Sequence, residues 1–535
     1  MGACSEFPVR NGDDDVTAEQ CIDELRDPRC YPQAPAAVQI IQTHLSVVCL
    51  AGDLVYKLKK AVTLPFVDFS SLAARRETCR AEVHFNRRLC RDTYLGTAAL
   101  RRDGEQLVFA AVGDDDSDDD LDVAVVMRRL PSDLMLDELL RRGKATSEHM
   151  RQLAELIAKF HRGAVRDEAT RRYGDPERLR QFVINNFDEL REVKDHGLSV
   201  ALLDRLARSS KEAFELIAEE LHERAVSSFL VDGHGDLHAR NVCMTNPPTV
   251  YDCIEFEPAF RCGDVATEVA FLTMDLRYRG APALADTFVE AYVTATGDLR
   301  LPALLPMLSS YRAMVRAKVD AMASVESELS VEERAASSES ARRYLLLAAA
   351  YLMETRGPWW LLTCGPPASG KSRLAALLAD TVQWPHLATD VIRKQRAGVA
   401  PTEQARPEHY TAEFSDETYA ALYQAAGEHT AAGQRCVILD GNFATSERRA
   451  DALQAARAVG ARLAIAFVDV DVATARQRAA FRAGDANNVS DADADVAERL
   501  HRAFVAPIAE ECDVLIGLEG TAPSEELADA LMAAF

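Results

Sequence analysis

The sequence has neither a long apolar run nor a basic-then-apolar secretion signal at its start. The longest clean apolar run, Leu345–Met353, falls far short of the roughly 20 residues that a membrane-spanning helix needs. Near the N-terminus, Asp13, Asp14 and Asp15 stand where a signal would carry basic residues. We therefore expect a protein of the cytoplasm that does not enter a membrane.

Paired cysteines and an excess of basic residues are also missing. The 12 cysteines form no CxxC pair and no Cys/His cluster at zinc spacing, so they indicate reduced, mostly buried thiols. The chain has 61 basic and 84 acidic residues, a net charge of −23, which disfavours nucleic acid or an anionic membrane surface as the main partner. Apolar residues make up 48%, which excludes a wholly disordered chain.

The 535 residues predict several domains, since a domain typically has about 150 residues. We predict a flexible tail over 1–33, a domain over 34–323 with strands before helices, a helical linker over 324–356 and an α/β domain over 357–535 with a parallel sheet. The run 113–120, rich in Asp, indicates a solvated hairpin loop. The principal strands are expected at 46–50, 54–59, 107–112, 123–127, 229–231, 250–254, 359–364, 436–439, 463–468 and 514–518, with a helix at 72–89.

A glycine-rich loop follows the apolar strand Leu361–Cys364. It reads Gly-Pro-Pro-Ala-Ser-Gly-Lys-Ser from Gly365 to Ser372 and leads into an apolar-periodic helix, which is the complete GxxxxGK[ST] pattern. Backbone amides of the loop, including those of Ser369 and Gly370, can surround phosphate oxygens at a helix N-terminus. Lys371 can reach the β- and γ-phosphates, and the Ser372 hydroxyl can bind Mg²⁺. The pattern predicts a nucleoside triphosphate site, with ATP or GTP left open.

The segments after this loop resemble P-loop kinases such as polynucleotide kinases and zeta toxins. Val437–Asp440 is an apolar strand that ends in a carboxylate suited to the Mg²⁺ shell, and Thr389–Lys394 carries Asp-x-x-Arg. The resemblance implies Asp390 as the general base and Arg393 as a clamp on substrate or phosphate. The residues alone also fit a helix N-cap with an exposed ion pair.

Three arginines on one helical stretch, Arg476, Arg478 and Arg482, form either a lid over the phosphates or an exposed basic face. We choose Arg478 as the residue that contacts the nucleotide.

A second loop, His234–Asn241, is dense in His and Asp. A kinase needs one carboxylate near the acceptor hydroxyl, then an amide ligand for Mg²⁺, then a metal-binding carboxylate on the next strand. Asp236, Asn241 and Asp252 meet this need in order and spacing. His234 and His238 alone do not indicate zinc, because no third ligand accompanies them.

The pattern His-Gly-Asp-Leu-His-x-x-Asn followed by a strand Asp resembles the aminoglycoside phosphotransferase and choline kinase-like family. Together with the P-loop domain, it resembles bacterial bifunctional aminoglycoside phosphotransferase/ATP-binding proteins. The resemblance implies a bilobal protein-kinase-like fold with Asp236 as the catalytic base and Asn241 and Asp252 as metal ligands. It also implies that Asp264 braces the loop.

The N-terminal segment supplies the remaining parts of a kinase. Lys57 is our choice for the lysine on the α- and β-phosphates, with Lys59 as the competitor, and Glu82 is its partner on the next helix. Met127 begins the hinge whose backbone would bind adenine. The GxGxxG loop of protein kinases is absent, and only 51–53 occupies its place.

We therefore predict a tandem ATP-dependent, Mg²⁺-dependent kinase that phosphorylates hydroxyls of small molecules such as sugars, aminocyclitols or amino-alcohols. One alternative is a single catalytic domain regulated by nucleotide binding in the other. Another is a C-terminal kinase for nucleic-acid 5′-hydroxyls, which the acidic balance and the lack of a basic, aromatic groove disfavour. The acceptor and the oligomeric state are left open.

Overall fold

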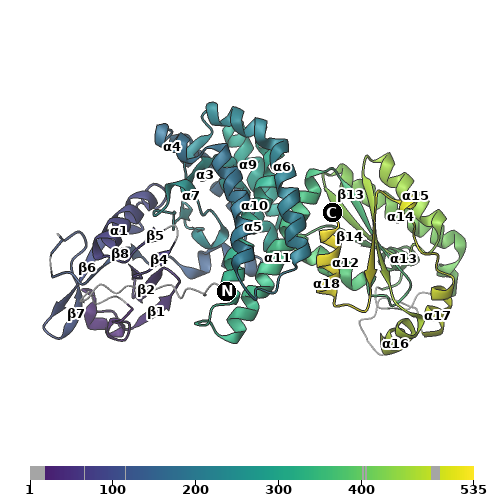
Figure 1. Ribbon diagram of the computed structural model, residues 1–535, viewed down its shortest axis with the longest axis horizontal. Helices are drawn as coiled ribbons and strands as arrows, with labels where there is room; N and C mark the ends of the chain where they lie inside the picture. The colour runs from purple at the N-terminus through teal and green to yellow at the C-terminus, as the bar shows by residue number, and fades with distance from the viewer. Residues whose placement is uncertain are drawn as a thin grey trace, which may run out of the picture. The chain divides into compact units, whose positions relative to one another are not determined.

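The chain forms two compact units in its computed structural model (Figure 1). One unit holds the residues up to Leu179 together with Glu219–Leu301, and the other holds Arg180–Ala218 together with Pro302–Phe535. Each unit carries one of the two motif-bearing loops. The structure describes residues 19–64, 67–114, 116–117, 119–400, 403, 406–482 and 494–535.

The first unit begins with a six-stranded antiparallel sheet in the order β1-β2-β3-β8-β6-β7. The predicted hairpin between the first strands is confirmed: Ala51 pairs with Leu54 around Gly52, whose φ of +66° suits glycine. Helix α1 packs against β6 and β8. The bounds are β1 Val38–Gln42, β2 Ser46–Ala51, β3 Leu54–Lys59, β4 Thr63–Leu64, β5 Val67–Asp68, α1 Leu72–Asn86, β6 Tyr94–Asp103, β7 Gln106–Phe109 and β8 Asp122–Arg128.

Part of the predicted N-terminal tail is structured. Residues 1–18 lie outside the described residues, but two short 3-10 helices, η1 Glu24–Arg26 and η2 Pro28–Cys30, follow them. Leu25 and Tyr31 are buried in the core of the sheet, where Tyr31 packs on Tyr56. The prediction of a loose tail up to residue 33 is therefore wrong for this segment, because its apolar side chains have a core to join.

The acidic run 113–120 is anchored, not simply solvated. Asp120 is buried and accepts hydrogen bonds from Arg101 Nε at 2.6 Å and Arg76 Nη2 at 2.8 Å. Asp116 pairs with Arg80, whereas residues 115 and 118 lie outside the described residues. The charge pattern alone could not show these partners, because they lie on α1 and β6.

The rest of the first unit, and the stretch Arg180–Ala218 that belongs to the second, are mainly helical. Two short antiparallel strands, β9 and β12, pair behind the catalytic-loop sequence, and α3 packs along α9. The bounds are η3 Ser132–Leu134, α2 Leu136–Arg141, α3 Ser147–Gly163, α4 Glu168–Tyr173, α5 Pro176–Glu192, α6 Val200–Val226, β9 Leu230–Asp232, η4 Ala239–Asn241, β10 Val242–Cys243, β11 Thr249–Val250, α7 Pro258–Arg261, β12 Cys262–Asp264, α8 Val265–Tyr278 and α9 Pro282–Thr296.

The second unit contains the predicted parallel sheet, with strand order β14-β15-β13-β16-β17. Every residue of β13 and β15 is buried, as expected for strands covered on both faces. The bounds are α10 Leu301–Ser324, α11 Val331–Thr355, β13 Trp359–Cys364, α12 Lys371–Val382, β14 His386–Ala388, α13 Thr389–Ala397, η5 Pro407–Tyr410, α14 Ala412–Ala431, β15 Cys436–Asp440, α15 Ser446–Ala458, β16 Arg462–Asp469, α16 Val472–Arg482, α17 Ala494–Arg502, η6 Ala509–Glu511, β17 Val514–Glu519 and α18 Ser524–Ala533.

The segment predicted as a linker, 324–356, is largely one helix of the second unit. Helix α11 packs against α12 and α18, and its residues from Tyr344 to Glu354 are buried. The domain bounds 34–323 and 357–535 stay a prediction, since the compact units divide the helices differently. Within the described part of the chain, no helix is long and apolar enough to cross a membrane.

Candidate active sites

Asp236 and Asn241 are brought together in the loop after β9. Asn241 Nδ2 donates to the backbone oxygen and to Oδ2 of Asp236, both at 3.0 Å. His238 Nε2 lies 3.2 Å from the same carboxylate oxygen, while His238 Nδ1 accepts from the Arg240 amide at 3.3 Å. The proton of the neutral His238 ring therefore belongs on Nε2 and points at Asp236. Two donors fix the carboxylate of the predicted base.

Helix α8 braces this loop from behind. Glu268 accepts hydrogen bonds from the amides of His234 and Gly235, the latter at 2.9 Å, and from His161 Nε2 at 2.9 Å. Burial alone would raise the pKa of Glu268, but the His161 hydrogen bond helps to lower it to about 2. Two turns further along α8, Asp275 accepts the Ala239 amide at 2.9 Å. Buried carboxylates thus hold the loop backbone through charge-assisted hydrogen bonds.

His234 is a structural residue of the loop. Its Nε2 donates to the Tyr251 carbonyl at 3.0 Å, and its Nδ1 accepts the Asp236 amide at 3.3 Å. Burial lowers the pKa of His234, which favours the neutral ring that these two bonds require. Among the described residues, no group of three or more His, Cys, Asp or Glu side chains is arranged to hold a metal ion.

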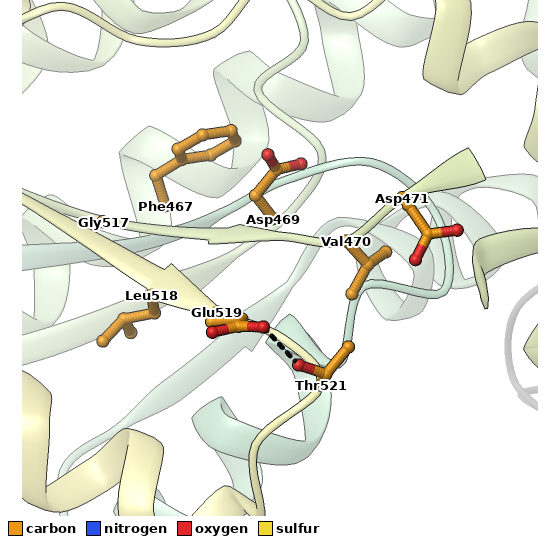
Figure 2. Close-up of a pocket in the computed structure, with 8 residues that line it drawn as sticks. All are labelled: Phe467, Asp469, Val470, Asp471, Gly517, Leu518, Glu519 and Thr521. Carbon is orange, nitrogen blue, oxygen red and sulfur yellow. Dashed lines mark hydrogen bonds between the residues drawn. The ribbon is translucent and has the colours of Figure 1, made fainter. Parts of the chain in front are cut away.

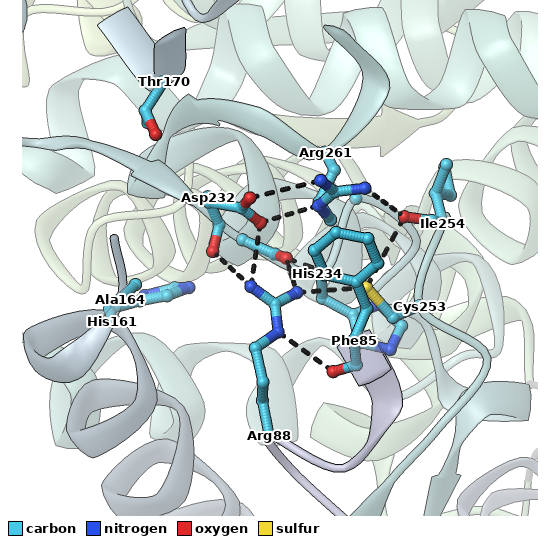
Figure 3. A network of polar contacts seen from close by, with 12 residues as sticks. Phe85, Arg88, His161, Ala164, Thr170, Asp232, His234, Cys253, Ile254 and Arg261 are labelled. Carbon is cyan, nitrogen blue, oxygen red and sulfur yellow. Dashed lines mark hydrogen bonds and ion pairs between the residues drawn. The ribbon is translucent and has the colours of Figure 1, made fainter. Parts of the chain in front are cut away.

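An arginine network joins the end of β9 to α1 (Figure 3). Arg88 donates to the Asp232 carboxylate at 2.8 Å and to the Gly233 carbonyl at 2.6 Å. Arg261 donates to the same carboxylate at 2.6 Å, and its guanidinium lies 3.6 Å from the Phe85 ring centre. Neither arginine is marked by a local motif, because Arg88 lies 144 residues from Asp232 in the sequence.

Asp264 braces the start of α8, and the implied bracing of the loop itself stays a prediction. Arg224 donates to both of its carboxylate oxygens, at 2.8 and 2.9 Å, and Asp264 also caps α8 by accepting the Ala266 amide at 2.8 Å. Arg224 lies 3.9 Å from the Phe229 ring centre. Every one of these contacts fixes the backbone at the start of α8.

Lys57 links the sheet to the second carboxylate of the motif. Its Nζ lies 2.9 Å from Glu82 Oε1 and 2.6 Å from Asp252 Oδ1. Lys59 also reaches Glu82, at 2.5 Å, but its other partner is Glu255 at 2.5 Å. Burial alone would lower the pKa of Lys57, but the charges of Asp252 and Glu82 raise it above its usual value. Lys57 is therefore the lysine that faces Asp252.

Asp252 does not lie on a strand, contrary to the prediction of a strand over 250–254. Strand β11 ends at Val250, and Asp252 has a φ of +62°, in the left-handed region that non-glycine residues seldom adopt. Its amide donates to the Tyr94 hydroxyl at 3.3 Å. The irregular backbone turns the carboxylate toward Lys57, and such strain is typical of functional sites.

Met127 lies at the predicted hinge. It is next to last in β8 and pairs with Val55 and Tyr94. The following segment leaves the sheet, with the Arg129 amide donating to the Asp53 carbonyl at 2.8 Å. The hinge therefore adjoins the Gly52–Asp53 turn, the segment in the place of the missing glycine-rich loop.

The P-loop of the second unit is tightly constrained. A Cβ on Gly365 would lie 2.3 Å from the Val468 carbonyl oxygen, and Gly370 has a φ of +104°, so both positions require glycine. Ser369 is fully buried, and its Oγ has no hydrogen-bond partner among the described residues. Lys371 Nζ lies 3.4 Å from the Pro366 carbonyl oxygen, inside the loop. This glycine cradle with an orphaned hydroxyl fits a bound phosphate chain.

Asp440 ends β15 beside this loop. Its Oδ1 accepts from Thr363 Oγ1 at 3.0 Å, and His386 Nε2 lies 3.4 Å from Oδ2. Burial alone would raise the pKa of Asp440, but His386, the charge of Lys371 and a hydrogen bond from Ser372 lower it. The carboxylate is therefore ionised next to the Ser372 hydroxyl, and this pair fits Mg²⁺. No sequence motif marked His386.

Arg478 contacts the P-loop. From α16 it donates to the carbonyl oxygens of Ser369 at 3.3 Å and Gly520 at 2.8 Å. Arg476 instead pairs on the surface with Asp495 and Glu498, and the side chain of Arg482 lies outside the described part. Of the two arginines whose side chains are described, Arg478 is the one that contacts the P-loop, and its contact with the nucleotide stays a prediction.

A pocket of about 500 Å³ lies beyond Arg478, at the carboxyl ends of β16 and β17 (Figure 2). The carboxylates of Asp469, Asp471 and Glu519 line it, and Thr521 Oγ1 donates to Glu519 at 2.9 Å. Gly520, which binds Arg478, lies between two of the lining residues. The pocket thus adjoins the P-loop.

Asp390 and Arg393 are both on α13, which starts directly after β14. Because Ala388 pairs with Asp440 in the parallel sheet, Asp390 begins its helix at the same sheet edge as Asp440. Arg393 is buried rather than solvent-facing, which contradicts the alternative of an exposed ion pair. Its Nη1 donates to the His409 carbonyl at 2.7 Å and to Ser415 Oγ at 3.3 Å.

Family models match both motif-bearing parts of the chain. Residues 69–304 match a model described as a phosphotransferase enzyme family, and this range includes Glu82, Asp236, Asn241 and Asp252. Residues 361–507 match a model described as an AAA domain, which includes the P-loop. The chain is a kinase-type phosphotransferase. The phosphotransferase match lies mostly in the first unit but includes Arg180–Ala218 of the second, and the P-loop match lies wholly in the second.

The phosphotransferase resembles curated proteins over most of its length. It is 29% identical over 469 residues to uncharacterized proteins of Mycobacterium tuberculosis (strain H37Rv) and Mycobacterium bovis, covering 86% of this chain and 89% of theirs. Among solved structures, a choline/ethanolamine kinase family protein from Mesorhizobium loti is 15% identical, with a TM-score of 0.38 over 68% of this chain and 99% of its own. A gluconokinase from Sinorhizobium meliloti is 16% identical, with a TM-score of 0.25 over 33% and 91%.

Proposed function

We propose that the protein is a tandem kinase with two ATP-dependent phosphotransfer sites, one in each unit. The observation that supports the proposal is that each unit brings close together a lysine and an aspartate that the motifs predict to bind phosphate and metal. In the first unit these are Lys57 and Asp252, 2.6 Å apart. In the second they are Lys371 and Asp440, and the charge of Lys371 lowers the pKa of the Asp440 carboxyl.

In the first unit, Asp236 accepts the proton of the acceptor hydroxyl as that oxygen attacks the γ-phosphate of ATP. Asn241 and His238 hold the carboxylate at the required orientation through their bonds to Oδ2. Lys57, fixed by Glu82, binds the α- and β-phosphates, and the backbone from Met127 onward binds adenine. Mg²⁺ held by Asn241 and Asp252 would neutralise the charge of the transferring phosphates.

In the second unit, the amides around Gly365, Ser369 and Gly370 bind the triphosphate together with Lys371. Arg478 covers the phosphates, and the adjoining pocket at the ends of β16 and β17 holds the nucleoside, with ATP as the donor that we propose. Ser372 and Asp440 would hold Mg²⁺. Asp390 is the proposed base, with Arg393 as the clamp.

The acceptors that we propose are hydroxyl-bearing small molecules. The net charge of −23 disfavours a polyanionic acceptor such as a nucleic-acid strand. Regulation of one unit by nucleotide bound in the other is the competing interpretation, and it predicts phosphate transfer by a single unit.

Two substitutions test the tandem proposal. We expect Asp236→Ala to abolish transfer to one set of acceptors in a metabolite panel, and Lys371→Ala to abolish transfer to another, each followed by the mass gain of phosphate. Arg240→Ala in the first loop and Arg373→Ala in α12, both exposed, are matched controls that should retain both activities. If either substitution removes all transfer, only one unit is catalytic. If neither affects any transfer, the proposal fails.

A further inference from the structure

The acceptor side of the P-loop site is a separate pocket of about 470 Å³. It is built from α13, α14, the loop after β15 and the start of α15. Its position follows from the sheet: the loop with Asn442 continues directly from Asp440, and α13 carries the proposed base Asp390 one turn before Arg393. The lining residues are Arg393, Ser415, Asp416, Tyr419, Asn442, Ala444, Thr445, Glu447, Arg448 and Asp451.

Arg393 is the buried charge of this pocket. Only 7% of the residue is exposed, and its guanidinium stacks 4.8 Å from the Tyr410 ring centre. Its Nη1 donates hydrogen bonds to two neutral groups, the His409 carbonyl and the Ser415 hydroxyl. Its Nε has no hydrogen-bond partner among the described residues. A buried guanidinium without a counter-ion is costly, so an anion from a ligand would be stabilised here.

The other charges of the pocket differ from Arg393 in burial and pairing. Arg448 is already paired with Asp416 and stacks 4.8 Å from the Tyr419 ring centre. Glu447 and Asp451 are exposed and therefore form an acidic rim. Among the residues that the structure describes, the pocket thus has one positive charge without a counter-ion inside and negative charge outside. This arrangement suits a small molecule with a single anionic group and disfavours a polyanion.

We propose that this pocket binds an alcohol that carries one carboxylate or phosphate group, with the anion on Arg393. The inference rests on the proposed kinase function of the second unit and names its class of acceptor. Guanidinium groups bind carboxylate and phosphate oxygens through two parallel hydrogen bonds, and Nε of Arg393 has no partner among the described residues. The anion is thereby fixed one helical turn from the base.

The proposed step transfers the γ-phosphate of ATP to the acceptor hydroxyl. The acceptor hydroxyl gives its proton to the Asp390 carboxylate, and its oxygen forms a bond to the γ-phosphorus of ATP. The bond between that phosphorus and the β,γ-bridging oxygen breaks, so ADP leaves with the electron pair. The product carries the original anion and a new phosphate ester.

The test uses the full-length protein with ATP and Mg²⁺, and matched sets of three- to seven-carbon hydroxy acids, phosphate esters and neutral polyols. We expect the acidic members to be phosphorylated, and Arg393→Gln to raise their KM about 10- to 100-fold, as expected for the loss of a charged hydrogen bond. Arg396→Gln is the matched control, because Arg396 lies on the same helix, is exposed and pairs with Glu417. Lys371→Ala must abolish the activity, which assigns it to this unit. Comparing hydroxy acids with phosphate esters shows which anion is used.

A binding measurement separates this inference from the proposed function. With both nucleotide sites saturated by a non-hydrolysable ATP analogue, the acidic panel is titrated by calorimetry into the parent protein, Arg396→Gln and Arg393→Gln. Binding that only Arg393→Gln loses, without transfer, would retain the anion pocket and refute the kinase step. The inference would be overturned if neutral polyols or an oligonucleotide 5′-hydroxyl were the preferred acceptors. It would also be overturned if Arg393→Gln left the KM of the acidic acceptors unchanged. The absence of both transfer and binding would overturn it as well.

Tryptophan fluorescence confirms that each variant is folded, since all three tryptophans, Trp359, Trp360 and Trp384, are buried in this unit.

Discussion

Asp529 permits a quantitative test of the packing between α18 and α11. Its side chain is only 15% exposed, and its Oδ1 has no hydrogen-bond partner among the described residues. The nearest cation, Arg342 Nη1, is 3.8 Å away and is itself next to Glu339. Burial, only partly offset by Arg342, raises the pKa of Asp529 from 3.8 to about 6. The ionised carboxylate is therefore a penalty at neutral pH.

The size and sign of the penalty follow from linkage. A carboxyl whose pKa is raised in the folded state contributes stability below its unfolded pKa, and this contribution is lost as the pH rises through about 6. A shift of about two units corresponds to at most about 3 kcal/mol, at about 1.4 kcal/mol per unit. Because the group is partly exposed and Arg342 is near, we expect Asp529→Asn to stabilise the second unit by about 1–2 kcal/mol at pH 7.5. At pH 4.5, between the unfolded and folded pKa values, only about a third of the gain should remain.

The assay is urea unfolding followed by tryptophan fluorescence at both pH values. All three tryptophans lie in the second unit, so their signal reports its unfolding and not that of the first. Asp380→Asn, at an exposed position on α12, is the control and should show no comparable gain. A destabilised Asp529→Asn, or a gain of equal size at both pH values, would refute the burial argument.

Three further outcomes test the two sites. Lys57→Met should lower transfer by the first unit at least about 100-fold, with little loss of fold. Lys59→Met leaves two buried carboxylates without this partner. It should therefore lower the free energy of unfolding by about 3 kcal/mol or more, measured by thermal unfolding with circular dichroism. Gly365→Ala places a Cβ 2.3 Å from a carbonyl oxygen and should abolish nucleotide binding at the P-loop, measured by calorimetry. The Cβ that Gly370→Ala adds lies 3.9 Å from its nearest neighbours, so this variant should weaken binding less. Arg478→Gln loses bonds to two carbonyl oxygens and should weaken ATP binding at that site about 10-fold, without changing transfer by the first unit.

The features that could be predicted from the sequence are those encoded within a few residues. The P-loop pattern from Gly365 to Ser372 lies between its own strand and helix, and Asp440 ends an apolar strand, so local reasoning was sufficient to place them. The same holds for the hairpin around Gly52 and for the order of Asp236 and Asn241.

The features that were missed depend on partners far apart in the chain. Glu268 accepts a hydrogen bond from His161, which lies 107 residues away in the sequence. No local pattern distinguishes Glu268 from the other residues of α8. Asp252 was assigned to a strand because its neighbours are apolar, but its contact with Lys57 requires a left-handed backbone. The buried state of Arg393 likewise depends on the loop that contributes His409. Burial and pairing of charges are properties of the tertiary structure, so the sequence could name these residues without giving their surroundings.

The two proposed sites would compensate phosphate charge by different physical means. In the first unit, Lys57 and Lys59 face three carboxylates, Glu82, Asp252 and Glu255, so this cluster has no excess positive charge for a triphosphate. Charge compensation there must come mainly from the divalent cation that accompanies ATP. The P-loop instead offers neutral backbone amides oriented by α12, together with Lys371 and Arg478. Neither device needs a basic surface, and a net charge of −23 is therefore compatible with two nucleotide sites while it repels larger polyanions.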